Sequence, residues 1–278
     1  MQYRLMAIDL DGTSIEDGQL PNERVRKAVA AATGRGVRVI VATGRPYTSA
    51  LQYGAALELR TPLICYQGAL VKEVEGRRET LLAEEMPEAE LEEAVAFAEQ
   101  HHLDLNLYTE EAFYLARLAH PQAFYDQWFN LPLRTVGSLV DALPRLRSQG
   151  HKFLKALFLG EPADGDRLLP VLRDRFAGRL TVVRSHSLMV EICSLSASKG
   201  QALAFLAGRF GIPRAETIAV GDSGNDESMV RWAGLGVAVA NAMPEVLAAA
   251  DWVAPPVTED GVVEVIERFI LRNGHAGS

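Results

Sequence analysis

Short apolar runs alternate with amphipathic segments in the first third of the chain. Leu5–Ile8 and Val37–Ala42 are apolar and bounded by turn residues, which is the pattern of buried parallel strands. Asn22 is a favourable N-cap for a helix between them. That helix has apolar residues at helical spacing: Val25, Ala28, Val29 and Ala32. A strand, a helix and a strand of these lengths predict a right-handed crossover with parallel pairing.

The same alternation returns later in the chain. Leu63–Tyr66 predicts a third core strand, and Thr217–Val220 predicts another. A helix starts at Ser196–Gly200, and further strands and helices follow to the end: Gly236–Asn241, Pro244–Ala250, Trp252–Ala254 and Gly261–Leu271. These elements predict an α/β core with a parallel sheet and helices on both faces.

Between about Leu82 and Val190 the pattern changes. Pro87–His101 is an amphipathic helix, and alternating or apolar strands surround a second helix. These segments are Asp104–Tyr108, Ala112–Leu115, Phe153–Leu159, the helix Asp164–Phe176, Leu180–Val183 and Leu188–Cys193. They predict a separate α+β unit with one open sheet and helices on one face. We call residues 83–193 the cap, and residues 1–82 and 194–278 the core.

Two carboxylates follow the first strand directly. Asp9 and Asp11 point to the same side of an extended chain, and Gly12 allows a sharp turn. Carboxylates this close repel one another unless a cation lies between them or one of them is protonated. Magnesium with phosphate would resolve the repulsion, because Mg²⁺ prefers oxygen ligands. Taken alone, the pair is also compatible with an ordinary loop or an incidental cation site.

Three later stretches also place polar groups at strand ends or helix starts. Thr43, Gly44 and Arg45 precede Pro46 at a helix N-terminus, where anions are favoured, although such a segment is also a common polar loop. Lys199 lies in the first turn of a helix, where a cation opposes the dipole unless it faces anions. After Thr217–Val220 come three more carboxylate or amide groups: Asp222, Asn225 and Asp226.

Together these four stretches resemble the four motifs of the haloacid dehalogenase-like (HAD) superfamily, and in particular its Cof-type, sugar-phosphatase-like phosphatases. They are Asp9-Leu10-Asp11-Gly12-Thr13, Thr43-Gly44-Arg45, Lys199 and Gly221-Asp222-Ser223-Gly224-Asn225-Asp226, in the order of the family. The resemblance implies a Rossmann-like HAD core with an inserted α+β cap. Gln67 departs from the family pattern, which usually has Asn before Gly-Ala.

The resemblance also implies roles for these residues. Asp9 would be the nucleophile, and Asp11 the general acid and base. Phosphate would be bound by Thr43, Gly44, Lys199 and Asn225. Magnesium would be held by Asp9, Asp222 and the backbone carbonyl of Asp11, with Asp226 and Arg45 in support. The implied activity is magnesium-dependent hydrolysis of small phosphorylated metabolites, such as sugar phosphates, through an aspartyl-phosphate.

Two alternatives use the same residue types. A phosphomutase or phosphotransferase would pass the phosphoryl group to a sugar hydroxyl. A receiver-like regulatory module would hold a long-lived aspartyl-phosphate, but the second aspartate, Asp11, favours rapid hydrolysis and argues against this role.

Composition narrows the partners and the location. The net charge of −8 gives no electrostatic footprint for nucleic acid or an anionic membrane. No apolar run approaches bilayer length and no signal peptide precedes the first strand, so we expect a cytoplasmic protein. Cys65 and Cys193 lie in apolar segments and are expected to be buried thiols. Neither the oligomeric state nor the substrate is indicated by any motif.

The cap has weaker signals. Arg184 and His186, at the tip of a predicted hairpin, are its best candidates for substrate contact, although the pattern favours a solvated turn for both. We expect hinges near Leu82–Met86 and Glu191–Ser196, so that the cap closes over the site and excludes water.

Overall fold

The computed structural model describes residues 3–16, 18–186 and 188–272. Its core contains a five-stranded sheet in which every pairing is parallel. In spatial order the strands are β14 (Trp252–Ala254), β13 (Leu235–Val239), β12 (Thr217–Gly221), β1 (Leu5–Ile8) and β2 (Arg38–Val41). The predicted parallel pairing is confirmed, since β1 and β2 are parallel neighbours in the sheet and are joined in the sequence by a helix.

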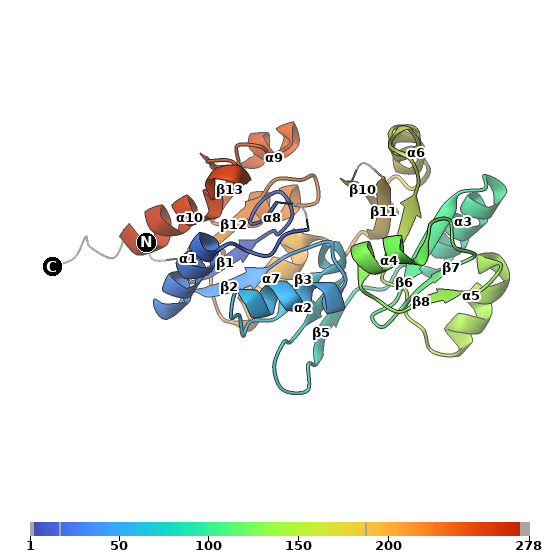
Figure 1. The fold of residues 1–278 in the computed structure, drawn as a ribbon, viewed down its shortest axis with the longest axis horizontal. Helices are drawn as coiled ribbons and strands as arrows, with labels where there is room; N and C mark the ends of the chain where they lie inside the picture. Colours follow the sequence, from blue (N-terminus) through green and yellow to red (C-terminus); the bar gives the residue numbers. More distant parts are fainter. Residues whose placement is uncertain (1–2, 17, 187, 273–278) are drawn as a thin grey trace.

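Alternation along β1 gives the core sheet two buried faces. Met6 and Ile8 pack in one apolar cluster, and Leu5 and Ala7 pack in another. The first cluster includes residues of α1 (Glu23–Gly34) and α10 (Gly261–Ile266), and the second includes residues of α7 (Lys199–Arg209) and α8 (Glu227–Trp232). Helices therefore cover both faces, as the sequence predicts (Figure 1).

Capping residues fix where two of these helices begin. The Asn22 side chain accepts a hydrogen bond from the amide of Val25 at 3.0 Å, as expected for the N-cap of α1. Ser198 caps α7 in the same way through the amide of Gln201 at 3.1 Å. This cap sets the position of Lys199 as the first residue of α7.

The segment that follows β2 differs from the expectation. Among the described residues, the ladder pairing of β3 (Leu63–Cys65) with the core sheet is limited to a single parallel bridge between Ala42 and Ile64. It belongs instead to a three-stranded antiparallel sheet with β4 (Leu70–Lys72) and β5 (Thr80–Ala83). The prediction of a third core strand was thus only partly right, because a tight turn after Cys65 folds the chain back onto β3.

Shorter elements complete the core. They are α2 (Tyr47–Ala56), the helical turn η1 (Tyr66–Gly68), η2 (Arg214–Glu216), α9 (Pro244–Ala249), η3 (Val257–Glu259) and η4 (Glu267–Leu271).

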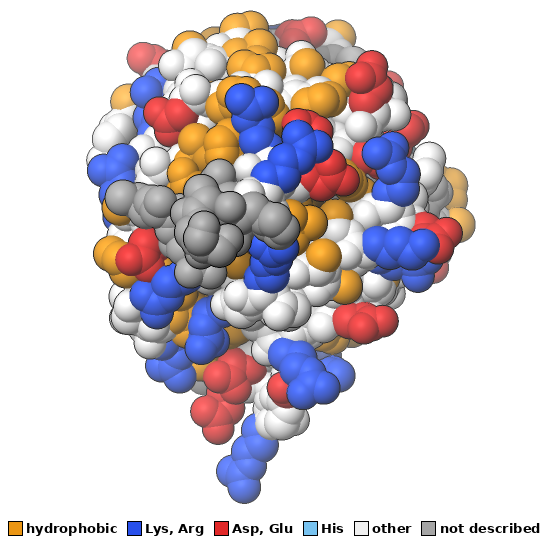
Figure 2. All heavy atoms as spheres, turned by 90° about the vertical axis from the view of Figure 1, so that its left-hand side faces the viewer, with side chains coloured by type: hydrophobic (Ala, Val, Ile, Leu, Met, Phe, Trp, Pro, Cys, Tyr) orange, Lys and Arg blue, Asp and Glu red, His pale blue; other side chains and the backbone are white. Residues whose placement is uncertain are grey.

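On the face of the core that points away from the cap, acidic and basic side chains are interspersed among hydrophobic ones (Figure 2). Both predicted thiols are buried, and burial raises the pKa of Cys193 to about 12.

The cap forms a second lobe around a six-stranded sheet (Figure 1). In spatial order its strands are β10 (Leu180–His186), β11 (Met189–Ser194), β9 (Lys155–Leu159), β6 (Asp104–Tyr108), β7 (Phe113–Leu115) and β8 (Leu133–Thr135). Only the pairing of β7 with β8 is parallel. The placement of the domain boundaries at residues 82/83 and 193/194 stays a prediction.

Helices cover one face of the cap sheet. They are α3 (Glu88–Gln100), α5 (Leu139–Ser148) and α6 (Pro162–Arg175), and their apolar residues share a cluster with Phe158 and Ile192. Leu157 and Met189 alternate with those strand residues and join the cluster of the core instead. A further helix, α4 (Gln122–Phe129), also belongs to the cap. The second face of the cap sheet therefore faces the core.

Among the described residues, none of the helices is both long enough and apolar enough to span a bilayer.

Candidate active site

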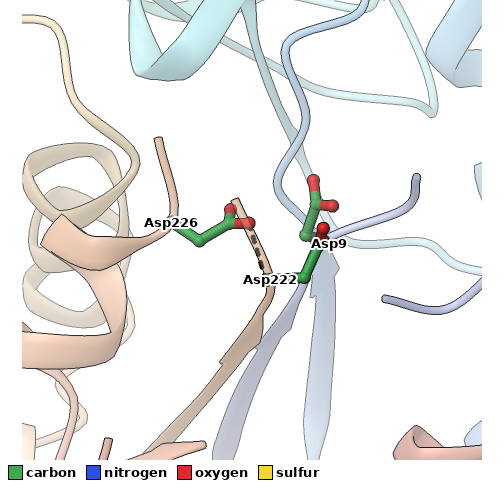
Figure 3. A group of neighbouring side chains, drawn as sticks. All are labelled: Asp9, Asp222 and Asp226. Atoms are coloured by element: carbon green, nitrogen blue, oxygen red, sulfur yellow. Dashed lines mark hydrogen bonds between the residues drawn. The ribbon is translucent and has the colours of Figure 1, made fainter. Parts of the chain in front are cut away.

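The carboxyl ends of two adjacent strands, β1 and β12, bring Asp9 close to Asp222 and Asp226. β1 and β12 pair with Ile8 opposite Val220, so the residues that follow them emerge at the same edge of the sheet. Asp9, Asp222 and Asp226 each offer a carboxylate oxygen, and these oxygens lie within 4.8 Å of one another (Figure 3). Asp9 is only 5% exposed and Asp226 is fully buried. Residues from motifs more than 200 positions apart thus form one acidic cluster.

Lys199 bridges two members of this cluster. Its Nζ donates to Oδ1 of Asp9 and to Oδ1 of Asp226, both at 2.6 Å, and its side chain is fully buried. The other oxygen of Asp226 accepts the backbone amides of Asp222 and Ser223 at 3.0 Å each. Both oxygens of Asp226 are therefore engaged, and this residue orients Lys199 and the loop after β12.

Asp222 is held by hydroxyl groups. Thr13 Oγ1 donates to Oδ1 at 2.6 Å, and Ser223 Oγ donates to Oδ2 at 2.9 Å. Gly12 has φ +81°, and a Cβ there would lie 2.5 Å from Oδ2 of Asp222. Only glycine meets both demands, because it adopts positive φ freely and leaves room for the carboxylate.

The charges in this cluster do not balance. Two buried carboxylates, Asp9 and Asp226, and the partly buried Asp222 face one ammonium group, which leaves an excess of two negative charges if all are ionised. Burial, and next the charge of Asp226, raise the pKa of Asp9 well above its ordinary value, and the same causes raise the pKa of Asp222 to about 6. Burial lowers the pKa of Lys199, but the charges of Asp226 and Asp9 outweigh it and raise that pKa overall.

A divalent cation fits this imbalance. Its charge would cancel the excess, and carboxylate oxygens are the ligands that Mg²⁺ prefers. Asp226 is already engaged by Lys199 and two amides, whereas Asp222 receives only hydroxyl donors, which leave carboxylate lone pairs available. Asp9 and Asp222 are thus the side chains best suited to hold a metal ion, and the predicted ligand set stays a prediction.

Asp11 lies on the open side of the cluster. Its carboxylate forms a two-pronged ion pair with Arg45, with Nε at 2.7 Å from Oδ2 and Nη2 at 2.6 Å from Oδ1. The Arg45 guanidinium carbon also lies 4.9 Å from the ring centre of Tyr53, and its backbone amide donates to Thr43 Oγ1 at 3.2 Å. Arg45 therefore fixes the side chain of Asp11 through its guanidinium group and contacts the Thr43 hydroxyl, in the same predicted phosphate loop, through its backbone amide.

A cavity of about 740 Å³ lies between the core and the cap. From the core it is lined by most of the predicted residues: Asp9, Asp11, Thr43, Gly44, Arg45, Asp222 and Asn225. Lys199 and Asp226 are absent from its lining and lie behind Asp9. From the cap it is lined by Asp126, Asn130, Lys155, Leu157, Met189 and Glu191. A volume of this size is typical of small-molecule sites.

The cap residues at the cavity differ from the predicted ones. Arg184 pairs with Asp166 of α6 and is not among the lining residues, and the side chain of His186 lies outside the described residues. Lys155 and Glu191, which the motifs do not reveal, lie on the inner face of β9 and β11 and form a buried ion pair at 2.9 Å. In the sequence, each of them stands out only as the one charged residue of an otherwise apolar segment, Phe153–Leu159 for Lys155 and Leu188–Cys193 for Glu191.

Gln67 joins the cap to the core in this cavity. Its Nε2 donates to Oε2 of Glu191 at 3.1 Å, and its Oε1 accepts from Nδ2 of Asn225 at 2.5 Å. The residue has left-handed backbone angles, with φ 60° and ψ 20°. A Cβ at Gly44 would lie 2.4 Å from Nε2 of Gln67, so a larger residue there would displace the Gln67 amide.

A buried acidic cluster with a paired lysine, at the carboxyl end of a parallel sheet and covered by an inserted cap, defines a hydrolase of the HAD type. The family model of haloacid dehalogenase-like hydrolases matches residues 6–266, and the chain belongs to that family. The resemblance inferred from the four motifs, the fold class and the prediction of a phosphatase-type enzyme are thereby confirmed.

Individual relatives agree with this assignment. YxeH of Bacillus subtilis is 33% identical, and the match covers 97% of this chain and 99% of the relative. The 5-amino-6-(5-phospho-D-ribitylamino)uracil phosphatase YcsE of the same organism is 28% identical over 98% of this chain and 97% of its own. The solved structure of a haloacid dehalogenase-like hydrolase from B. subtilis matches with a TM-score of 0.84 and 27% identity, covering 96% of this chain and 100% of that one.

Proposed function

We propose that this protein is a magnesium-dependent phosphatase that hydrolyses small phosphorylated metabolites through an aspartyl-phosphate on Asp9. The observation that carries the proposal is the buried cluster in which Lys199 bonds both Asp9 and Asp226 while an excess of negative charge remains. Mg²⁺ held by Asp9, Asp222 and the backbone carbonyl of Asp11 would neutralise charge on the transferring phosphoryl group. The remaining chemistry belongs to the chain itself.

In the first step an Asp9 oxygen forms a bond to phosphorus, and the bond from phosphorus to the leaving-group oxygen breaks. Lys199 holds Asp9 in one rotamer through a 2.6 Å hydrogen bond and adds positive charge beside the reacting carboxylate. Thr43, Gly44 and Asn225 line the same cavity. The Thr43 hydroxyl, the Gly44 amide and the Asn225 side chain would bind the phosphoryl oxygens. Preorganised donors of this kind supply most of the rate enhancement in phosphoryl transfer.

Asp11 would carry the protons. It protonates the leaving alcohol in the first step, and in the second step it takes a proton from the water that attacks the aspartyl-phosphate. In the structure its carboxylate is paired with Arg45, so this role requires Asp11 to exchange part of that pair for the leaving-group oxygen. The ion pair keeps the carboxylate within the cavity until substrate arrives.

The position of the cavity beneath the cap supports small substrates. Cap residues line one side of the 740 Å³ space, which accommodates a metabolite but leaves little room for a folded phosphoprotein. YcsE, a relative of similar length, is named for a phosphorylated ribitylaminouracil, which is a small metabolite with a sugar-like chain. We therefore place sugar phosphates and related compounds first among the candidates. The cap would close by hinges near Leu82–Met86 and at the end of the predicted segment Glu191–Ser196, beyond Ser194, because residues 191–194 belong to β11.

The test is release of inorganic phosphate from an aryl phosphate and from a panel of sugar phosphates, with magnesium and with a chelator. We expect release that stops on chelation and returns with Mg²⁺. Activity that survives thorough chelation would contradict the metal dependence. Product analysis separates the alternatives, since an isomerised sugar phosphate would indicate a phosphomutase, and a phosphorylated protein that persists for hours would indicate a receiver-like module.

A further inference from the structure

A buried ion pair on the inner face of the cap sheet reaches the core. Lys155 and Glu191 are joined at 2.9 Å, and their side chains are only 3% and 4% exposed. A buried pair loses much of its Coulomb attraction to desolvation, so apolar residues of similar volume would serve the stability of a sheet equally well. A role beyond holding β9 to β11 is therefore indicated.

Lys155 contacts the loop that follows β2. Its Nζ donates to the backbone carbonyl of Gly44 at 3.2 Å. It also lies 4.9 Å from the ring centre of Tyr108 and 5.4 Å from that of Tyr66, which is within the range of cation–π attraction. These contacts fix the ammonium group on the loop that carries Thr43 and Gly44.

Glu191 contacts a second part of the site through Gln67. The hydrogen bonds from Gln67 to Glu191 and from Asn225 to Gln67 continue the chain that Lys155 begins. The order of this relay is Lys155, Glu191, Gln67 and Asn225. Asn225 lies in the loop after β12 with Asp222 and Asp226, so the relay connects the cap to the loop that carries part of the acidic cluster.

The backbone around Gln67 is held in an uncommon conformation. Tyr66 and Gln67 both have positive φ, at 50° and 60°, which is unfavourable for residues other than glycine. Gly68 packs against the start of α7, where a Cβ would lie 2.2 Å from the carbonyl oxygen of Ser198. The side chain of Gln67 thus projects from a fixed point.

The length of this side chain matters. From the same backbone position an asparagine would be shorter by one methylene, or about 1.5 Å. It could not keep both the 3.1 Å bond to Glu191 and the 2.5 Å bond to Asn225. The residue by which this chain departs from the pattern of its family is therefore the one that completes the relay.

Gln67 also decides how the Asn225 amide is oriented. An amide nitrogen has two hydrogens, and Gln67 accepts one of them, which fixes the direction of the other. The Asn225 oxygen is buried and accepts no hydrogen bond from the described residues, so no second contact of that kind orients the group.

We propose that Gln67 is a positioning residue that couples closure of the cap to the orientation of Asn225 at the phosphate. The proposal rests on the proposed function, because it uses Asn225 as a phosphate ligand. When the cap closes, Glu191 reaches Gln67, and Gln67 turns the amide of Asn225 toward the transferring group. The closed cap thereby completes the site for phosphoryl transfer as well as excluding water.

The first experiment compares Gln67→Asn with Gln100→Asn, the same shortening at the exposed end of α3. With an aryl phosphate as substrate, we expect Gln67→Asn to lower kcat about 10- to 100-fold, the effect of misplacing a binding group by about 1 Å, with KM changed less than about threefold. Magnesium affinity and Tm should stay unchanged, because neither Asp9 nor Asp222 touches the relay. Gln100→Asn should behave as wild type.

The second experiment tests the link to the cap. The double variant Lys155→Met and Glu191→Met replaces the buried pair with apolar residues, a change that usually preserves folding. If the relay is real, adding Gln67→Asn to this variant lowers kcat by less than about threefold, because residues in one hydrogen-bonded network are not additive.

The outcomes are distinguishable. An inactive wild-type protein would overturn the proposed function and the relay together. An active wild type with an unchanged Gln67→Asn variant, or with losses that simply multiply in the combined variant, would overturn the relay alone. A loss in Gln67→Asn that is matched by a fall in Tm and in magnesium affinity would assign Gln67 a purely structural role and would also overturn it.

Discussion

The two sheets of this protein contribute to one cavity in different ways. The core sheet is parallel and covered on both faces, and the carboxylates of its site, Asp9 and Asp222, lie just beyond the strand ends. The cap sheet is mostly antiparallel and has α3, α5 and α6 on one face. Its other face carries Lys155, at the start of β9, and Glu191, inside β11. A strand end concentrates charge for chemistry, whereas a strand face spreads contacts over a ligand.

This difference suggests a division of work. In the proposed mechanism the core groups would touch the reacting atoms, whereas the cap groups would adjust what is bound and how the site closes. Each variant below is chosen to break or sharpen that division.

The largest effect is expected at Asp9. Asp9→Asn keeps the size of the side chain but removes the attacking charge, and we expect a loss of about 10⁴–10⁶-fold in kcat, as for other lost nucleophiles. Asp141→Asn, the same change at an exposed position of α5 in the cap, is the control and should be fully active. Phosphate release by Asp9→Asn at more than a hundredth of the wild-type rate would remove Asp9 from its role.

The next effect is expected at Asp11. Asp11→Asn retains the backbone carbonyl that the metal would use but loses the proton shuttle, and we expect a loss of about 10²–10⁴-fold. The loss should be larger for an alkyl phosphate than for an aryl phosphate with a good leaving group, because the latter needs little protonation in the first step. Equal losses on both substrates would indicate that Asp11 does not protonate the leaving group.

The same division explains what could be inferred from the sequence. Strand ends in the core carry contiguous polar motifs, so the sequence alone was enough to assign Asp9, Thr43, Lys199 and Asp222 to one edge of the sheet. The helices on both faces followed from period-two and helical patterns. Each of these inferences used information that is local in the chain.

The remaining features depend on contacts between distant segments. Lys155 and Glu191 are 36 positions apart and become partners only through the pairing of β9 with β11. The two-pronged ion pair of Arg45 with Asp11 and the role of Gln67 depend on side-chain reach, which no periodicity encodes. The strand at Leu63–Cys65 was predicted to extend the core sheet, but it pairs mainly with β4, and the sequence pattern does not distinguish these two partners.

A smaller effect is expected at Asp222 when metal is removed. It is a gain in stability on mutation, whereas the variants above lose activity. Its pKa is raised to about 6, against about 3.9 in an unfolded chain, so the folded protein retains a proton that the unfolded chain has lost. In chelator, the free energy of unfolding should therefore fall as the pH rises from about 4 to 6. Asp222→Asn cannot ionise and should flatten this dependence.

Thermal unfolding checks this prediction. At pH 7 in chelator we expect Asp222→Asn to melt about 2–4 °C above wild type, the shift that about 1 kcal/mol produces in domains of 150–250 residues. With Mg²⁺ the order should reverse, because wild type gains binding energy that the variant has lost. A variant that is less stable than wild type in chelator would show that the hydroxyl bonds of Thr13 and Ser223 outweigh the repulsion.

The smallest effect is expected at the cap side of the cavity mouth. Asp126 is exposed, lines the cavity and contacts Gln122, so Asp126→Asn should leave folding intact. Removal of its charge should lower KM about threefold for substrates with a second anionic group, and should leave kcat and the KM of a simple aryl phosphate unchanged. The difference should disappear at 1 M salt, where the Debye length is about 3 Å. A tenfold or greater fall in kcat would instead show that a cap residue takes part in the chemistry, and the division between a reactive core and an adjusting cap would then be wrong.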